Sequence, residues 1–140
     1  MRTRVPPPAR TAVVERSPMS TPIAASDLTW LLMDRPNNLM HVHGLMGFDE
    51  IPDFEAYREA VMERMVSKYR VLSQIPVQQD GHWHWEDDTD FSIQRHVLRI
   101  ELPGEGIAAV RDYVSRIFSQ PFDRAHPLWE MHLISTADPE

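Results

Sequence analysis

The sequence lacks several features on which common functional sites are built. It contains no cysteine, which excludes disulfide bonds and thiolate metal ligands. No apolar run approaches the roughly 18 residues of a membrane-spanning helix, and a Gly-rich phosphate loop and a nucleophile elbow are both missing. The first 20 residues hold four Arg and one Glu, which leaves 10 basic and 20 acidic side chains in residues 21–140, of the chain's 14 and 21. So acidic a body argues against nucleic-acid binding, which needs clustered Lys and Arg.

Residues 1–20 differ in composition from the rest of the chain. They are rich in Pro and Arg, show no hydrophobic periodicity and lack the apolar centre of a secretory signal. The run Pro6-Pro7-Pro8 would break the amphipathic helix of a mitochondrial-type targeting peptide. We therefore expect a disordered leader over residues 1–20, with Met19 as an alternative start of the protein. Residues 21–140 are long enough for one domain.

Hydrophobic periodicity predicts an alternation of helices and strands in this domain. A spacing of three to four residues predicts a helix capped by Ser26, a second capped by Asp53 and a third that begins at Ile107. Alternation of apolar and polar residues predicts strands at 40–48, 82–86, 91–102 and from Trp129 to Ile134, with a hairpin turn at Asp80-Gly81. The order α-β-α-β-β-α-β predicts an α/β (α+β) fold with helices packed on a mixed sheet.

Histidines form two H-x-H pairs, His41 with His43 and His82 with His84. On a strand, both imidazoles of such a pair lie on one face, where they could hold a zinc or copper ion. No third ligand is apparent, so we interpret them as ordinary strand histidines and predict no metal site. His84 and Asp88 have the spacing of a base with an orienting carboxylate, but an acidic loop explains them more simply. From the residues alone, no catalytic side chain is assigned.

Four stretches occur together, in order, between Ser26 and Ile134. They are SDLTWLLMD (26–34), NNLMHVHGLMGFD (37–49), HWHWEDDTDFSIQRHV (82–97) and LPGEGIAAVRDYVSRIFSQPFDRAHPLWEMHLI (102–134). This ordered set resembles the N-terminal part of the bacterial wax ester synthase/diacylglycerol acyltransferase family. The block Pro127-Leu128-Trp129-Glu130 is the most specific piece of the resemblance, and we expect these four residues to have a structural role.

The resemblance implies a fold, an activity and a set of substrates. The fold would be the N-terminal part of a chloramphenicol-acetyltransferase-like half. The activity would be transfer of a fatty acyl group from acyl-CoA, as co-substrate without a further cofactor, to diacylglycerol or a long-chain alcohol. In the family, the second His of an H-H-x-x-x-D-G motif takes the proton from the acceptor hydroxyl, and this motif follows the P-L-W-E strand. No His-His pair occurs in this sequence, so the resemblance assigns no catalytic residue here.

We therefore expect residues 21–140 to be a truncated N-terminal acyltransferase domain, inactive alone, produced by a sequencing frameshift, a split gene, a pseudogene or a shortened expression product. The alternative is a non-catalytic lipid-binding remnant or a split half that needs a second chain; a condensation-type domain acting on carrier-bound chains fits the P-L-W-E block less well. The family implies a cytoplasmic protein, at the inner membrane face or at lipid inclusions. The strand after Trp129 would expose apolar side chains and promote self-association.

Overall fold

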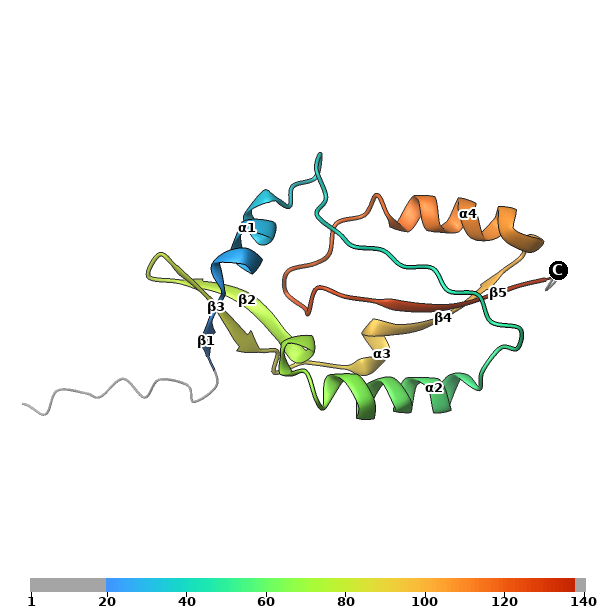
Figure 1. Cartoon of the computed structure of the whole chain (residues 1–140), viewed down its shortest axis with the longest axis horizontal. Coiled ribbons are helices and arrows are strands. Elements are labelled where there is room, and N and C mark those ends of the chain that lie inside the picture. Colours follow the sequence, from blue (N-terminus) through green and yellow to red (C-terminus); the bar gives the residue numbers. More distant parts are fainter. Residues whose placement is uncertain (1–19, 138–140) are drawn as a thin grey trace, which may run out of the picture.

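The computed structural model describes residues 20–137, and its centre is a parallel pair of strands between two helices. Strand β4 (Val97–Leu102) pairs in parallel with β5 (Met131–Thr136). Helix α4 (Gly106–Ile117) lies on one side of this pair and α2 (Phe54–Val61) on the other (Figure 1). Successive residues of β5 face opposite layers: Met131 accepts a hydrogen bond from Tyr57 of α2 at 3.7 Å, whereas His132 contacts Tyr113 of α4 at 2.8 Å.

A second, antiparallel sheet lies at the other end of the molecule. It has the order β1-β3-β2, from Thr21–Pro22, His82–Asp87 and Gln74–Gln79, with Pro76 opposite Trp85. The predicted hairpin turn is confirmed, since Asp80 and Gly81 join β2 to β3 with φ of 51° and 80°. Positive φ at both central residues is what a tight two-residue hairpin needs, and Asp-Gly adopts it at low cost. Residues 1–19 of the predicted leader lie outside the described residues.

The helices agree with their predicted positions but differ in detail. Helix α1 covers Ala25–Met33, so Ser26 lies inside it and is not its cap; the preceding Ala24 offers no side-chain oxygen. The Asp53 cap is confirmed, because its carboxylate accepts a hydrogen bond from the Ala56 amide at 2.8 Å. Beyond α2, the chain continues as a π-helical stretch η1 (Met62–Val66) and then a 3-10 turn η2 (Arg70–Ser73) that leads into β2.

Three of the strand predictions need correction. Residues 40–48 form no strand, because no other strand within residues 20–137 pairs with them. The segment 91–102 divides into the short helix α3 (Ile93–His96) and β4, and the last strand begins at Met131, not Trp129. The single mixed sheet is two separate sheets in the described residues, one antiparallel and one parallel. The alternation was correct, but a strand also needs a neighbour, which a single sequence does not show.

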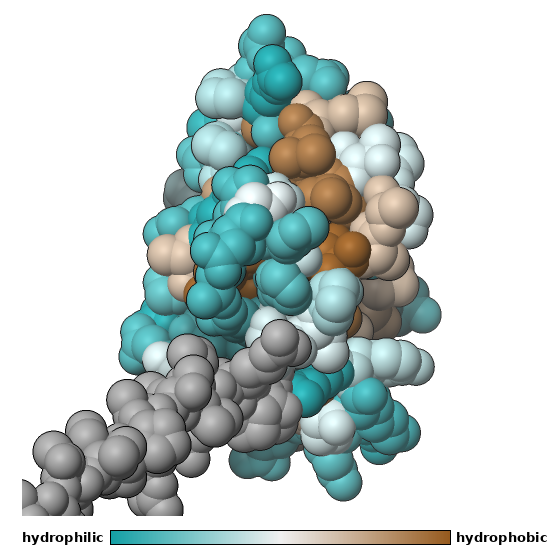
Figure 2. Space-filling view, turned by 90° about the vertical axis from the view of Figure 1, so that its left-hand side faces the viewer, coloured by the Kyte–Doolittle hydropathy of each residue, from teal (hydrophilic) through white to brown (hydrophobic). Residues whose placement is uncertain are grey.

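The core is small and large apolar side chains remain at the surface. Among the described residues, the apolar side chains that are almost fully buried are Ile23, Leu31, Val61, Val66 and Val97. Helix α1 buries only Leu31 and leaves Trp30, Leu32 and Met33 about half exposed. Figure 2 shows a hydrophobic patch on the face at the end of the molecule that carries α1 and the β2–β3 hairpin. Within residues 20–137, no helix has the length and apolarity required to cross a membrane.

Candidate functional site

The P-L-W-E block anchors the start of β5 to two other parts of the chain. The Trp129 indole Nε1–H donates to the Leu72 carbonyl oxygen at 2.7 Å, which fastens β5 to η2. The Trp129 carbonyl oxygen lies 2.8 Å from Nδ1 of His96, and their rings stack with centroids 4.7 Å apart. The ring of Phe91 also stacks on His96, with the two centroids 5.3 Å apart. We refer to Leu72, Phe91, His96 and Trp129 as the Trp129 cluster; it fixes where β5 begins.

The other residues of the block support this arrangement. Pro127 is buried, and its carbonyl oxygen accepts a hydrogen bond from the Trp129 amide at 2.9 Å in a tight turn. Leu128 is half-buried, whereas Glu130 is exposed and bonds to His132. None of these contacts places a base beside a nucleophile, and the structural role expected of the block stays a prediction.

His96 is the most buried titratable side chain of this site, with 2 % of its surface exposed. Since a carbonyl oxygen only accepts, Nδ1 of His96 carries the proton toward Trp129, and in the neutral imidazole Nε2 holds a lone pair. Nε2 is buried and has no hydrogen-bond partner in the part of the chain that the structure describes. A lone histidine before a strand carries no sequence motif, so the contacts of His96 become visible only in the structure. Chemically it is an acceptor in the interior.

A chain of three hydrogen-bonded side chains joins α4 to β5. Nε2 of His132 lies 2.8 Å from a Glu130 carboxylate oxygen, and its Nδ1 lies 2.8 Å from the Tyr113 hydroxyl. Because the carboxylate accepts from Nε2–H, the phenol donates to Nδ1. Burial raises the pKa of the Tyr113 phenol, and the negative charge of Glu130 adds to the rise. Tyr113 is therefore a hydrogen-bond donor to His132, and the three side chains tie α4 to β5.

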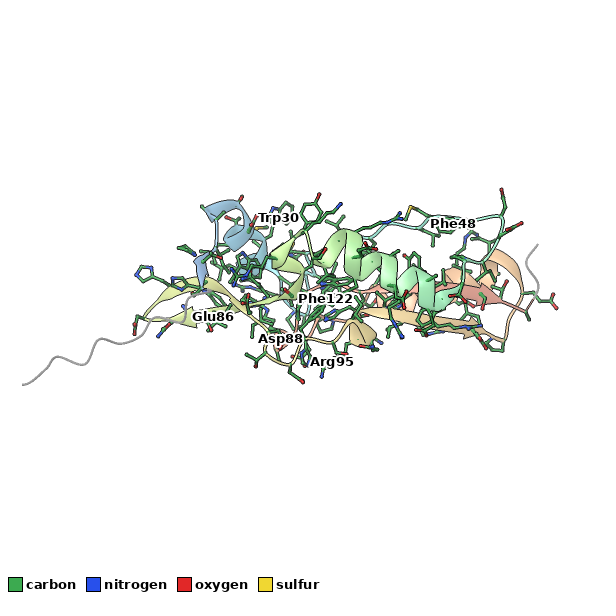
Figure 3. All side chains as sticks on the ribbon, turned by 90° about the horizontal axis from the view of Figure 1, so that it is seen from below. Trp30, Phe48, Glu86, Asp88, Arg95 and Phe122 are labelled. Carbon is green, nitrogen blue, oxygen red and sulfur yellow. The ribbon has the colours of Figure 1, made fainter. Side chains whose placement is uncertain are left out.

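Asp88 makes a pair that the sequence did not predict. Its carboxylate lies 3.3 Å from Nδ1 of His126, and the neighbouring Arg95 binds Asp90 at 2.6 Å. Figure 3 shows Asp88 and Arg95 close together beside α3. The suggested partner, His84, has a buried Nδ1 without a hydrogen-bond partner among residues 20–137. The partner of Asp88 lies 38 positions along the chain, in the loop before β5, where no short spacing reveals it.

The H-x-H pairs do not converge on a third ligand. His41 and His43 lie in the irregular segment 40–48. The His41 ring is tilted against Phe122 with centroids 4.5 Å apart, and the His43 ring stacks on Phe118 at 3.6 Å. Burial, and after it the neighbouring His41, lower the pKa of the His43 imidazole. Across residues 20–137, no group of three His, Asp or Glu side chains is arranged to hold a metal ion.

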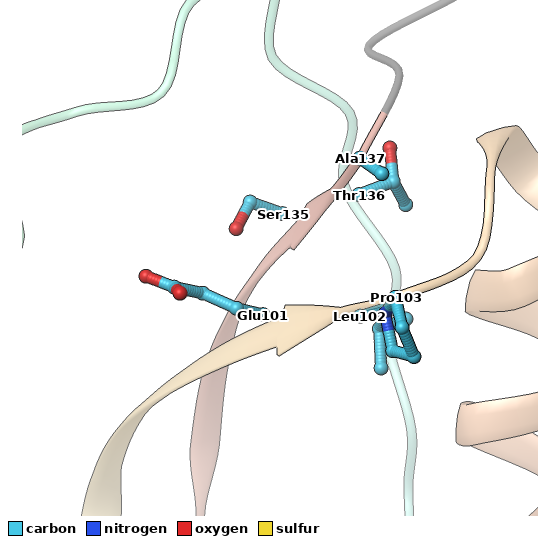
Figure 4. A pocket seen from close by; sticks show the side chains of 6 residues that line it. All are labelled: Glu101, Leu102, Pro103, Ser135, Thr136 and Ala137. Atoms are coloured by element: carbon cyan, nitrogen blue, oxygen red, sulfur yellow. The ribbon is translucent and has the colours of Figure 1, made fainter.

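A shallow hollow lies at the carboxyl ends of β4 and β5, where ligands often bind in α/β folds. It is lined by Glu101, Leu102, Pro103, Ser135, Thr136 and Ala137. Figure 4 shows Glu101 and Ser135 pointing to the same side of the strands. Its single ionisable group is Glu101, so the lining offers neither a general base with an orienting partner nor a cationic group for a phosphate. The P-L-W-E block lies at the opposite, amino end of β5.

Comparison with known proteins identifies the family to which this arrangement is similar. The model of the wax ester synthase/diacylglycerol acyltransferase catalytic domain matches residues 23–138. The probable diacylglycerol O-acyltransferase tgs3 of Mycobacterium tuberculosis is 32 % identical over 123 residues, which are 83 % of this chain and 45 % of the relative. The O-acyltransferase WSD of Acinetobacter baylyi is 30 % identical over 118 residues, 81 % of this chain and 25 % of the relative.

A solved structure shows the same fold. The wax ester synthase/diacylglycerol acyltransferase from Marinobacter aquaeolei VT8 superposes with a TM-score of 0.55 at 24 % identity, over 82 % of this chain and 30 % of that one. The predicted α/β fold class is thereby confirmed. The chain spans less than half the length of these curated relatives and about a third of the solved chain.

Proposed function

Because this chain belongs to the wax ester synthase/diacylglycerol acyltransferase family, we propose that it is an N-terminal portion of an O-acyltransferase. The reaction of the complete enzyme transfers a fatty acyl group from acyl-CoA to diacylglycerol or a long-chain alcohol. The observation that carries this proposal is the family match over residues 23–138, which includes all four stretches of the resemblance and the whole Trp129 cluster.

In this proposal the chain is a scaffold and another polypeptide segment supplies the base. The sequence contains no His-His pair, and therefore no H-H-x-x-x-D-G motif. The Trp129 cluster fixes the start of β5, the strand that in the family leads toward the catalytic loop. A residue such as His96 then acts at a distance from the chemistry, by holding the Trp129 carbonyl and the direction of β5.

The charge of the domain limits what it does with acyl-CoA. Residues 21–140 carry twice as many acidic as basic side chains, and the coenzyme's phosphates are anionic. We infer that the phosphates of the coenzyme bind to another portion of the enzyme. Residues 21–140 would instead contribute apolar side chains to the wall that surrounds the acyl chain. Exposed Trp30, Leu32 and Met33 on α1 support a contact with lipid, at the cytoplasmic membrane face or on lipid inclusions.

The second candidate is a non-catalytic half that binds lipid or a complementary chain. The exposed apolar residues of α1 favour it, as does the absence of the His-His pair. The predicted self-association depends on how exposed β5 is. Its residues are half-buried, so its side chains are less exposed than expected. In the described part of the chain, β4 is its one strand neighbour. Self-association through its other edge remains a proposal.

A chimeric enzyme tests the leading proposal. Residues 23–138 would replace the matched segment of the Acinetobacter baylyi O-acyltransferase WSD, and CoA release would be measured with acyl-CoA and diacylglycerol. We expect turnover by the chimera and no CoA release above background by the 140-residue chain alone. A folded but inactive chimera would contradict the proposal. Turnover by the chain alone, abolished by His84→Ala, would instead show that the base is in this portion.

A further inference from the structure

The loop that joins α4 to β5 is attached at two points to distant parts of the chain. Residues 118–130 run from the end of α4, past α1, to the start of β5 (Figure 1). Near the end of the loop, Trp129 binds η2 and α3, as described above. Earlier in the loop, Arg124 contacts the end of α1, which lies 90 to 93 positions away in the sequence. One loop therefore holds both α1 and the start of β5.

Arg124 binds the carboxyl end of α1. Its Nη2 donates to the Leu31 carbonyl oxygen at 2.8 Å and to the Asp34 carbonyl oxygen at 3.2 Å, and it lies 3.4 Å from the Asp34 carboxylate. The last carbonyl oxygens of a helix lack partners within the helix and carry its partial negative charge, so a cation is favourable there. Helix α1 has no basic residue in its own last turn. Arg124 supplies this cation from the loop.

The Asp34 carboxylate joins this contact to the start of segment 40–48. One of its oxygens accepts a hydrogen bond from the Met40 amide at 2.9 Å, and the other is the oxygen that faces Arg124. We refer to Arg124 and Asp34 as the α1 clamp. The clamp brings together the end of α1, the chain that follows it and the loop before β5.

Helix α1 has few other attachments to the domain. It has nine residues, and a helix this short is marginal by itself in water, so contacts with the rest of the chain must hold it in one orientation. Of its side chains, Leu31 alone is buried in the structure described. Within residues 20–137, Arg124 is the one side chain from beyond residue 40 that hydrogen-bonds to α1. The clamp therefore has a large share in setting where the helix lies.

We propose that Arg124 is a positioning residue of the acyltransferase, which holds α1 so that Trp30, Leu32 and Met33 face the acyl chain of acyl-CoA. This inference rests on the proposed function, in which residues 21–140 contribute apolar side chains to the wall around that chain. Arg124 acts through α1 and not on the reacting atoms. Its loss should therefore weaken the binding of long acyl chains and leave the chemical step nearly unchanged.

The clamp favours the acyl chain over a membrane surface as the partner of α1. The loop that carries Arg124 also fixes β5, the strand that in the family leads toward the catalytic loop. A helix tied in this way to β5 suits a ligand that must reach the catalytic loop from a fixed direction. Attachment to a membrane surface needs exposed apolar side chains but no fixed distance to β5.

Hydrogen exchange of the 140-residue chain tests the clamp. We expect Arg124→Met to speed the exchange of amides 28–34 at least about fivefold and to leave the amides between β4 and β5 unchanged. Arg124→Lys should restore slow exchange, because the contacts come from one nitrogen that an ammonium can replace. Asp34→Asn should act like Arg124→Met with a smaller effect, since the carbonyl contacts remain. Arg95→Met is the matched control: Arg95 is as exposed as Arg124 but binds Asp90.

Kinetics of the chimeric enzyme test the link to the acyl chain. In the chimera described above, Arg124→Met should raise KM for palmitoyl-CoA at least about fivefold and change kcat by less than about twofold. KM for hexanoyl-CoA should change by less than about twofold, because a short chain buries little apolar surface against α1. Arg124→Lys should recover the KM for palmitoyl-CoA, and Arg95→Met should not alter it.

The outcomes separate this proposal from the proposed function. Unchanged exchange in Arg124→Met overturns the clamp. A fall in kcat without a change in KM, or an equal rise in KM for both substrates, overturns the role in acyl-chain binding. A rise that appears only when diacylglycerol is supplied in vesicles also overturns it, because α1 then contacts a lipid surface. No turnover by the unaltered chimera contradicts the proposed function, whereas hydrogen exchange still decides whether Arg124 holds α1.

Discussion

The Trp129 region and segment 40–48 have similar sequence patterns, but only the first leads into a strand. Both alternate apolar and polar residues, and both contain histidines beside large apolar side chains. Around Trp129 the chain contacts a carbonyl in η2 and an imidazole in α3, and the residues that follow pair with β4 as a strand. Segment 40–48 meets aromatic rings on one side and no strand at all within residues 20–137. The difference teaches that alternation predicts which side chains share a face, whereas the neighbours decide whether a strand forms.

Removal of the Trp129 side chain should give the largest effect in this comparison. Trp129→Ala deletes the bond to the Leu72 carbonyl and one ring of the stack on His96. We expect a loss of about 3–5 kcal/mol in the free energy of unfolding, measured by urea denaturation. Trp129→Phe keeps a ring but not the indole donor, and should lose about 1 kcal/mol. Trp30→Ala is the control, since that tryptophan is 57 % exposed; an equal loss there would show that the Trp129 cluster is not special.

Substitution of Asp87 tests a buried contact of the antiparallel sheet. Its carboxylate accepts from the amide of Gln74, which is 4 % exposed, at 2.9 Å, and it also binds Arg70. Asp87→Ala leaves a buried amide without its partner, so we expect a loss of about 1–3 kcal/mol. Arg70→Met removes the more exposed ion pair and should cost at most about 1 kcal/mol. Urea denaturation of both variants measures the difference, and the reverse order would contradict the importance of Gln74.

The attachment of segment 40–48 to the α4 end should depend on pH. The pKa of His43 is lowered in the folded chain from its ordinary 6.5, so the unfolded chain binds the proton first as pH falls. Stability from this group is complete above pH 6.5, decreases as pH falls through 6.5 and stops changing below the folded-state pKa. The side chains that face the His43 imidazole are His41 and Phe118, and neither carries a negative charge that would favour its protonation.

Urea midpoints at pH 7.5 and pH 5.5, about one unit on either side of the ordinary pKa, measure this effect. His43→Gln should lose less stability on acidification than the unaltered chain. His82→Gln, on the exposed end of β3, should behave like the unaltered chain. Equal losses in the unaltered chain and in His43→Gln would show that the proton on His43 does not affect folding.

The smallest effect on the free energy of unfolding is expected from substitution of an exposed apolar side chain in segment 40–48. Val42 is 97 % exposed, so Val42→Ser should change the free energy of unfolding by no more than about 0.5 kcal/mol. Val97→Ser at the 1 % exposed position in β4 is the matched comparison and should be strongly destabilising. A large effect of Val42→Ser, measured by urea denaturation, would mean that this side of the segment is covered in solution.

The sequence predicted the local features of the fold better than the distant contacts. The Asp53 cap and the Asp80-Gly81 turn depend on a few adjacent residues, and both were identified correctly. The partners of Asp88 and Trp129 lie 38 and 57 positions away, so no short motif contains them. For the same reason, the P-L-W-E block was recognised as a family feature, but its contact with Leu72 and His96 became visible only in the structure.

Amide hydrogen exchange of the free chain is the most direct test of the contrast between these two regions. Segment 40–48 should exchange nearly as fast as an unstructured peptide, because its amides have no backbone partner in the described residues. The amides that join β4 to β5, between 97 and 101 and between 131 and 135, should exchange at least about 100-fold more slowly. Similar protection in the two regions would contradict the account, since segment 40–48 would then already be paired in the chain alone.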